Sequence, residues 1–137
     1  MATFHFELVS PERQLYSGAV EQVVVPGSEG DFSILAGHSP FVSTLRPGIL
    51  TIHGDGQPKR LFVRGGFAEV SAGGLTVLAE RATPVEDLHA GQIDQEIRNA
   101  EEDLADAKDD AARARAAERL DQLKGVKAAL STAGSTH

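Results

Sequence analysis

The sequence changes character abruptly at Pro84, and this change limits the folds open to the chain. All six prolines and all seven aromatic residues lie at or before Pro84, whereas the residues after it include twelve alanines and no proline or aromatic residue. Proline and glycine punctuate turns, while alanine is the strongest helix former. The sequence therefore predicts a β unit over residues 1–84 and a helical unit over residues 85–137, with a frayed end from Ser131.

The first unit has the pattern of short strands separated by turns. Phe4, Phe6 and Leu8 recur with a period of two, which is typical of a half-buried strand. Residues 60–63 and 67–70 are expected to form separate strands, with a bulge or tight corner at the Arg-Gly-Gly segment between them. Segments at this spacing predict an all-β sandwich or small barrel of about ten strands.

The second unit has the periodicity of an amphipathic helix. Apolar residues recur at steps of three and four, which places them on one face. Asp109 and Asp110 favour a second helix by capping its start, which would give an antiparallel hairpin. No Gly or Pro enforces that break, so the residues alone are equally compatible with one continuous helix. The predicted seam of a hairpin consists of Ile93, Ile97, Ala100, Leu104, Leu120 and Leu123.

Residue types that carry chemistry are sparse in this chain. It has no Cys, which excludes disulfides and thiolate chemistry, and its five His lack metal-binding spacing. A net charge of −7 disfavours contact with nucleic-acid phosphates. No run of apolar residues is long enough to cross a membrane, and the first eight residues lack the pattern of a signal peptide. We expect no catalytic residue, metal, cofactor, nucleic-acid partner or direct membrane insertion.

One pair of charged residues on the predicted helix has two interpretations. Asp94 and Arg98 are four residues apart, a spacing that favours a surface ion pair. The functional alternative is that Arg98 binds a nucleotide phosphate together with an arginine across the hairpin. The candidates for that second arginine are Arg113, Arg115 and Arg119.

Several segments of unusual composition follow one another along nearly the whole chain. They are Gly27-Ser28-Glu29-Gly30, Ile34 to Pro40, Leu45 to Gly48, Val63 to Val70 and Thr76 to Ala79. Together they resemble the epsilon subunit of bacterial F-type ATP synthase. The resemblance implies a ten-stranded β-sandwich followed by a two-helix domain. It also implies a non-catalytic rotor subunit of the central stalk, which couples rotation of the c ring to ATP synthesis.

The same resemblance implies partners and contact residues. The partners are the gamma subunit and the c ring, at the cytoplasmic face of the bacterial inner membrane, as a peripheral part of the F1 sector. Loops at one end of the sandwich are expected to meet the c ring. The helices are expected to reach the alpha and beta subunits when they extend, and then to inhibit ATP hydrolysis. The matching c-ring positions are Glu29, Gly30, Asp31, His38, Ser39 and Pro40.

A nucleotide motif of some family members is only partly matched. Those members bind ATP through an Ile/Leu-Asp-x-x-Arg-Ala motif on the first helix. Ile93 and Asp94 fit the motif, but Arg98 is one position late, which rotates its side chain by about 100° around the helix. Asp94 and Arg98 are therefore the candidate nucleotide contacts, and the shifted register predicts that no nucleotide is bound.

Two functions from other classes are also compatible with the residues. One is a free-standing β-domain adaptor with a coiled-coil tail, which the amphipathic second unit would supply. The other is a sugar-binding or small-ligand β-sandwich, which needs aromatic side chains facing a groove. The seven aromatic residues lie mostly at strand-interior positions, so we expect them in the core.

Overall fold

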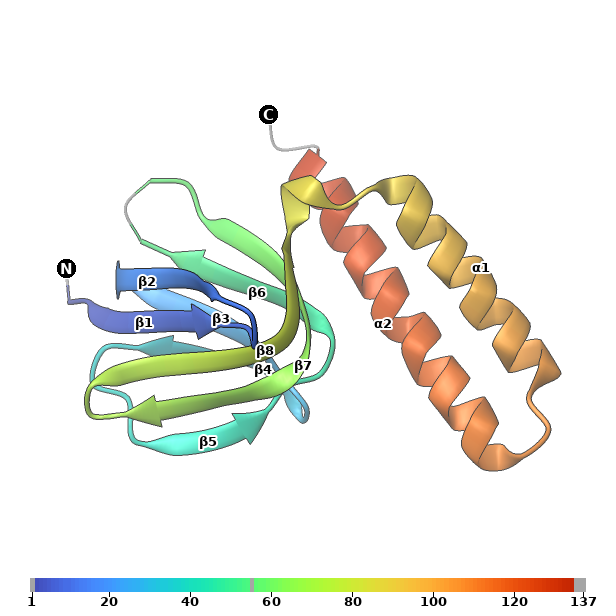
Figure 1. Cartoon of the computed structure of the whole chain (residues 1–137), viewed down its shortest axis with the longest axis horizontal. Coiled ribbons are helices and arrows are strands. Elements are labelled where there is room, and N and C mark those ends of the chain that lie inside the picture. Colours follow the sequence, from blue (N-terminus) through green and yellow to red (C-terminus); the bar gives the residue numbers. More distant parts are fainter. Residues whose placement is uncertain (1, 55, 135–137) are drawn as a thin grey trace. The chain divides into compact units, whose positions relative to one another are not determined.

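The chain divides into two compact units in a computed structural model that describes residues 2–54 and 56–134. The first unit, Met1–Pro84, is all-β, and the second, Val85–His137, is helical (Figure 1). The strands are β1 (Phe4–Val9), β2 (Gln14–Val20), β3 (Gln22–Gly27), β4 (Gly30–Leu35), β5 (Phe41–Thr44), β6 (Gly48–His53), β7 (Lys59–Ser71) and β8 (Gly74–Pro84). The helices are the short 3-10 helix η1 (Val85–Asp87), α1 (Ala90–Asp106) and α2 (Asp110–Gly134).

Two long strands, β7 and β8, belong to both layers of the sandwich. The first half of β7 pairs with β6 and its second half pairs with β5. Strand β8 follows β7 along its length, and the early residues of β8 also pair in parallel with β1. One layer has the order β2-β1-β8-β7-β5, and the other has the order β8-β7-β6-β3-β4. The described residues thus form eight strands that supply five segments to each layer, in agreement with the predicted sandwich of about ten.

The bend of β7 occurs at two glycines. Gly65 and Gly66 have φ angles of +73° and +118°, which side chains other than glycine rarely adopt. A Cβ atom at Gly66 would lie 1.9 Å from the carbonyl oxygen of Leu78 on β8. The prediction of separate strands at residues 60–63 and 67–70 is therefore wrong. The two glycines bend one strand while its pairing with β8 continues on both sides.

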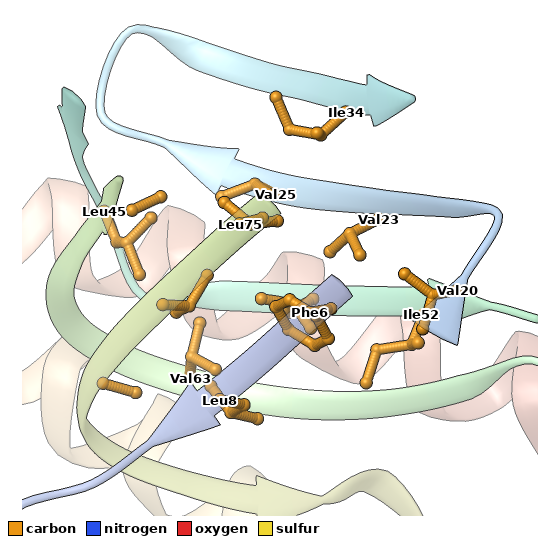
Figure 2. Close-up of a cluster of buried hydrophobic side chains, with 14 of the residues drawn as sticks. Phe6, Leu8, Val20, Val23, Val25, Ile34, Leu45, Ile52, Val63 and Leu75 are labelled. Carbon is orange, nitrogen blue, oxygen red and sulfur yellow. The ribbon is translucent and has the colours of Figure 1, made fainter. Parts of the chain in front are cut away.

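The core lies between the two layers (Figure 2). Phe6 and Leu8 of β1 are completely buried, as the period of two in that segment predicts. Val23 of β3 and Ile34 of β4 face them from the other layer and are also buried. Each fully buried side chain of this kind stabilises the fold by roughly 1.5–3 kcal/mol. Because the two layers pack together through these buried side chains, the turns and loops at the ends of the strands are held in fixed positions.

The helical unit is a hairpin, which settles the choice that the residues left open. The Asp109 side chain accepts a hydrogen bond from the backbone N–H of Ala112 at 2.7 Å and so caps α2, while Ala107 has an extended backbone that ends α1. Helix α2 runs to Gly134 and so includes the first four residues of the segment that is predicted to fray from Ser131. Residues 135–137 lie outside the described residues.

Candidate interaction surfaces

The six residues predicted to contact the c ring lie at opposite ends of β4. Glu29, Gly30 and Asp31 lie at the turn between β3 and β4, which we call the turn surface. His38, Ser39 and Pro40 lie in the connection from β4 to β5, which we call the loop surface. The six residues of β4 span about 15–20 Å at about 3.3 Å per residue. The expectation that one end of the sandwich carries all six residues is therefore wrong.

The turn surface is tied to the segment that follows β5. The backbone N–H of Ser28 donates to the carbonyl oxygen of Thr44 at 3.0 Å, and the two hydroxyl groups lie 2.8 Å apart. The guanidinium of Arg46 pairs with the carboxylate of Asp31. Glu29, in contrast, is exposed. The turn thus presents the open carboxylate of Glu29 and the carboxylate of Asp31, whose charge Arg46 balances; residue spacing does not predict the pairing of Asp31 with Arg46.

The loop surface combines a histidine with apolar neighbours. The His38 ring lies 5.3 Å from the ring of Phe41, measured between centroids. Leu35, at the end of β4, is 53% exposed. Together with residues 3–5 and 70–74, the loop lines a shallow depression at this end of the β unit. The loop surface is therefore less charged than the turn surface and contains exposed apolar area.

A second apolar surface lies on the outward side of β5 and β7. Val42 is 64% exposed and Phe67 is 41% exposed. The register pairs Val42 with Glu69 and Thr44 with Phe67, so Val42 and Phe67 are diagonal neighbours on one face. We call these two residues the strand patch. The expectation that the aromatic residues lie in the core is wrong for Phe67, and the alternation with the buried Ala68 is the signal that places it outward.

The predicted seam residues lie on α1 and α2 with different degrees of burial. Ile93, Ala100 and Leu123 are buried, and the other three are half-buried. Val126, which is not among the predicted seam residues, is only 2% exposed, and Ala116 is also buried. The half-buried seam residues are Ile97, Leu104 and Leu120.

The predicted ion pair between Asp94 and Arg98 is wrong, because both side chains have other partners. Asp94 Oδ1 lies 2.7 Å from Lys127 Nζ on α2. Arg98 donates to the side-chain oxygen of Gln95 at 2.9 Å. The partner of Asp94 is therefore Lys127 on the facing helix, and not Arg98 on its own helix.

The arginines considered as phosphate ligands face carboxylates of the hairpin itself. Arg119 lies 3.8 Å from Glu96 and 3.7 Å from Asp103, and both carboxylates are on α1. Arg113 lies 3.2 Å from Asp110. Two of the three candidate arginines are therefore directed toward acidic side chains, and not toward a shared position beside Arg98.

The described residues contain no group of three or more His, Cys, Asp and Glu side chains that could hold a metal ion. In the same part of the chain, no helix has both the length and the apolar composition needed to cross a bilayer. What the β unit does present is exposed apolar and acidic surface on a rigid sandwich. Exposed apolar surface of this kind is typical of proteins that dock on other proteins.

Comparisons with known proteins agree with that class. The profile of the family described as "ATP synthase, Delta/Epsilon chain, beta-sandwich domain" matches residues 3–85. An ATP synthase epsilon chain of Parvibaculum lavamentivorans is 57% identical over 124 residues, which cover 90% of this chain and 94% of the relative. An epsilon chain of Rhodopseudomonas palustris strain BisA53 is 51% identical over 137 residues and 100% of both chains.

A solved structure extends the comparison to the whole fold. One chain in the cryo-EM structure of the Euglena gracilis mitochondrial ATP synthase, OSCP/F1/c-ring, has a TM-score of 0.83 and 26% identity. The match covers 95% of this chain and 82% of that chain. The chain belongs to the family of ATP synthase epsilon chains. The predicted family, and its role as a non-catalytic subunit of the central stalk, are thereby confirmed.

Proposed function

We propose that this epsilon chain joins the gamma subunit to the c ring through two separate parts of its β unit. The turn surface would meet the c ring and the loop surface would meet gamma. The strand patch, whose Val42 lines a depression together with the turn residues, would extend the gamma contact along β5 and β7. The observation that carries this division is the placement of the two surfaces at opposite ends of β4. A flat ring contacts one end of a sandwich, so one of the two surfaces is left for another partner.

Charge and rigidity support the turn surface as the c-ring contact. Glu29 is exposed there, and an exposed carboxylate complements basic loops of the ring and helps to fix register. The hydrogen bonds between Ser28 and Thr44 restrain the turn, so little order is lost on binding. A restrained acidic turn is suited to transmitting torque between two rotating parts.

Exposed apolar area supports the strand patch as the gamma contact. Val42 and Phe67 form adjacent apolar area on a face where the neighbouring strand residues Thr44 and Glu69 are polar. Apolar surface with a polar rim is characteristic of protein interfaces, and aromatic residues often dominate their energy. We therefore assign this face to a permanent neighbour within the stalk.

Binding to gamma is the direct test of the proposal. The purified chain and the cognate gamma subunit are mixed and separated by gel filtration, with each protein alone as the reference. We expect the two to elute together as a complex of one copy each. Separate elution at micromolar concentrations would contradict the proposed function.

We expect the helical unit to inhibit ATP hydrolysis only mildly in the assembled enzyme at the cytoplasmic face of the inner membrane. From Glu86 onward the chain has seven basic and twelve acidic residues, a net charge of −5. The arm as a whole is repelled by acidic loops of the alpha and beta subunits, because the negative charge of α1 exceeds the net charge of +2 on α2. Truncation after Asp87 should therefore change the ATPase rate of the complex by less than about twofold, because a weak contact of about 0.4 kcal/mol corresponds to that ratio. A many-fold increase in the rate would show that the arm is a strong inhibitor.

A further inference from the structure

The two helices of the hairpin carry opposite charge. Helix α1 has six acidic residues and one basic residue, for a net charge of −5. Helix α2 has five basic and three acidic residues, for a net charge of +2. Opposite net charges on antiparallel neighbours attract one another, so the hairpin has an electrostatic component in addition to its apolar seam.

Three ion-pair contacts join α1 to α2, and they lie at two levels along the hairpin. At one level, Lys127 Nζ lies 2.7 Å from Asp94 Oδ1, and this oxygen atom is buried with no aligned hydrogen-bond donor. The lysine is thus the group that compensates its charge. At the other level, Arg119 lies between Glu96 and Asp103, which are seven residues and about two turns apart on α1. One guanidinium therefore bridges two turns of the facing helix.

The apolar seam of the hairpin is thinner at the level of Arg119 than at the level of Lys127, where Ile93 and Val126 are buried. Ala100 and Ala116 are buried, and alanine removes much less apolar area from water than leucine does. Asp94 and Glu96 have exposed side-chain fractions of 35% and 20%, whereas Lys127, Arg119 and Asp103 are 53%, 48% and 65% exposed, so solvent ions screen these contacts in part. At the level of Arg119 the ion pairs therefore carry more of the interhelical attraction than they would across a leucine-rich seam, and at the level of Lys127 the ion pair adds to the contact between apolar residues.

We propose that these pairs form a clasp that keeps the hairpin closed without any bound ligand. The clasp consists of Asp94 with Lys127, and of Arg119 with Glu96 and Asp103. In this clasp the side chains of Lys127 and Arg119 hold α1 against α2, so no external ligand is needed. In the stalk, a closed hairpin would keep α2 away from the catalytic subunits, and this consequence alone rests on the proposed function.

The distance between the helices tests the clasp in the full chain without any partner subunit. Gly91 on α1 and Gly125 on α2 are exposed, and a Cβ atom at either position meets no atom within 4 Å. Because the chain has no Cys, the variant with cysteines at both positions accepts two spin labels and no others. Pulsed EPR then gives the distance distribution between the open ends of the hairpin. Helix α1 has 17 residues and is about 25 Å long, so opening at Ala107 to Asp109 produces a large shift.

We expect one short distance in the labelled parent and a second, longer population in Lys127→Glu. The ratio of open to closed hairpin should rise roughly fivefold or more, because attraction at Asp94 becomes repulsion. The charge-swapped variant Asp94→Lys/Lys127→Glu should return to the short distance, which excludes misfolding as the cause. The matched control is Lys124→Glu, which reverses an exposed lysine on the same helix. An unchanged distance in Lys127→Glu, an equal effect of Lys124→Glu, or no recovery in the swapped variant would overturn the clasp.

Discussion

Replacing Gly66 by alanine is expected to destabilise the β unit by about 3 kcal/mol or more. Its φ of +118° is a strained conformation for alanine, which costs about 1–3 kcal/mol. The added Cβ atom would also lie 1.9 Å from the Leu78 carbonyl oxygen, so the backbone of β8 must move. Forced repacking of this kind costs typically about 1–3 kcal/mol more. The bend that joins the two layers of the sandwich would then be lost or distorted.

Denaturant unfolding followed by tyrosine fluorescence measures this effect in the β unit alone. Tyr16 is the only tyrosine, and the chain has no tryptophan, so the signal comes from β2. Gly54→Ala is the matched control, because its φ is not positive and its nearest atoms would be 3.9 Å from the new Cβ atom. We expect that control to change the free energy of unfolding by less than about 1 kcal/mol. Equal stability of the two variants would show that the bend at Gly66 does not depend on glycine.

Replacing Phe67 by aspartate is expected to weaken binding to the gamma subunit by about 30-fold or more. Phe67 is 41% exposed and lies beside Val42, so a partner would bury both side chains. Loss of an aromatic anchor at the centre of an interface costs about 2 kcal/mol or more, which corresponds to this ratio. A buried aspartate without a partner adds a further penalty.

Calorimetric titration of the full chain into purified gamma gives the dissociation constant for this comparison. Ser33→Asp is the control, because it introduces the same charge at an exposed position of β4 outside the strand patch. Both variants should keep the unfolding midpoint of the parent within a few degrees, since neither changed side chain is buried. If Phe67→Asp and Ser33→Asp bind equally well, the strand patch is not the gamma contact.

Much of the fold could be predicted because local periodicity and the loop motifs agree. The period of two in β1 identified the inward positions of Phe6 and Leu8, and Asp109 indicated where a second helix would begin. A corner at Gly65 and Gly66 could be predicted, but the continuation of one strand through it could not, because a pair of glycines is equally compatible with a turn that ends a strand. Only the continuous pairing with β8 distinguishes the two.

The surfaces were predicted less well, for reasons of geometry. Glu29 and His38 are close in sequence, but the extended strand between them places them at opposite ends of β4. Lys127 interrupts an apolar pattern on α2, and nothing in that pattern indicates that its partner is Asp94 on the other helix. Contacts between different elements depend on how the elements pack. The spacing of residues within one element carries no information about that packing.

Cross-linking from single cysteines in the assembled ATP synthase tests the central claim most directly. Because the chain has no Cys, Glu29→Cys and Ser39→Cys each carry one thiol for a short photoactivatable cross-linker. We predict that Glu29→Cys yields adducts with the c subunit, while Ser39→Cys yields adducts with gamma and none with c. Adducts of both variants with the c subunit, or of Glu29→Cys with gamma alone, would contradict the division of the β unit into a c-ring end and a gamma end.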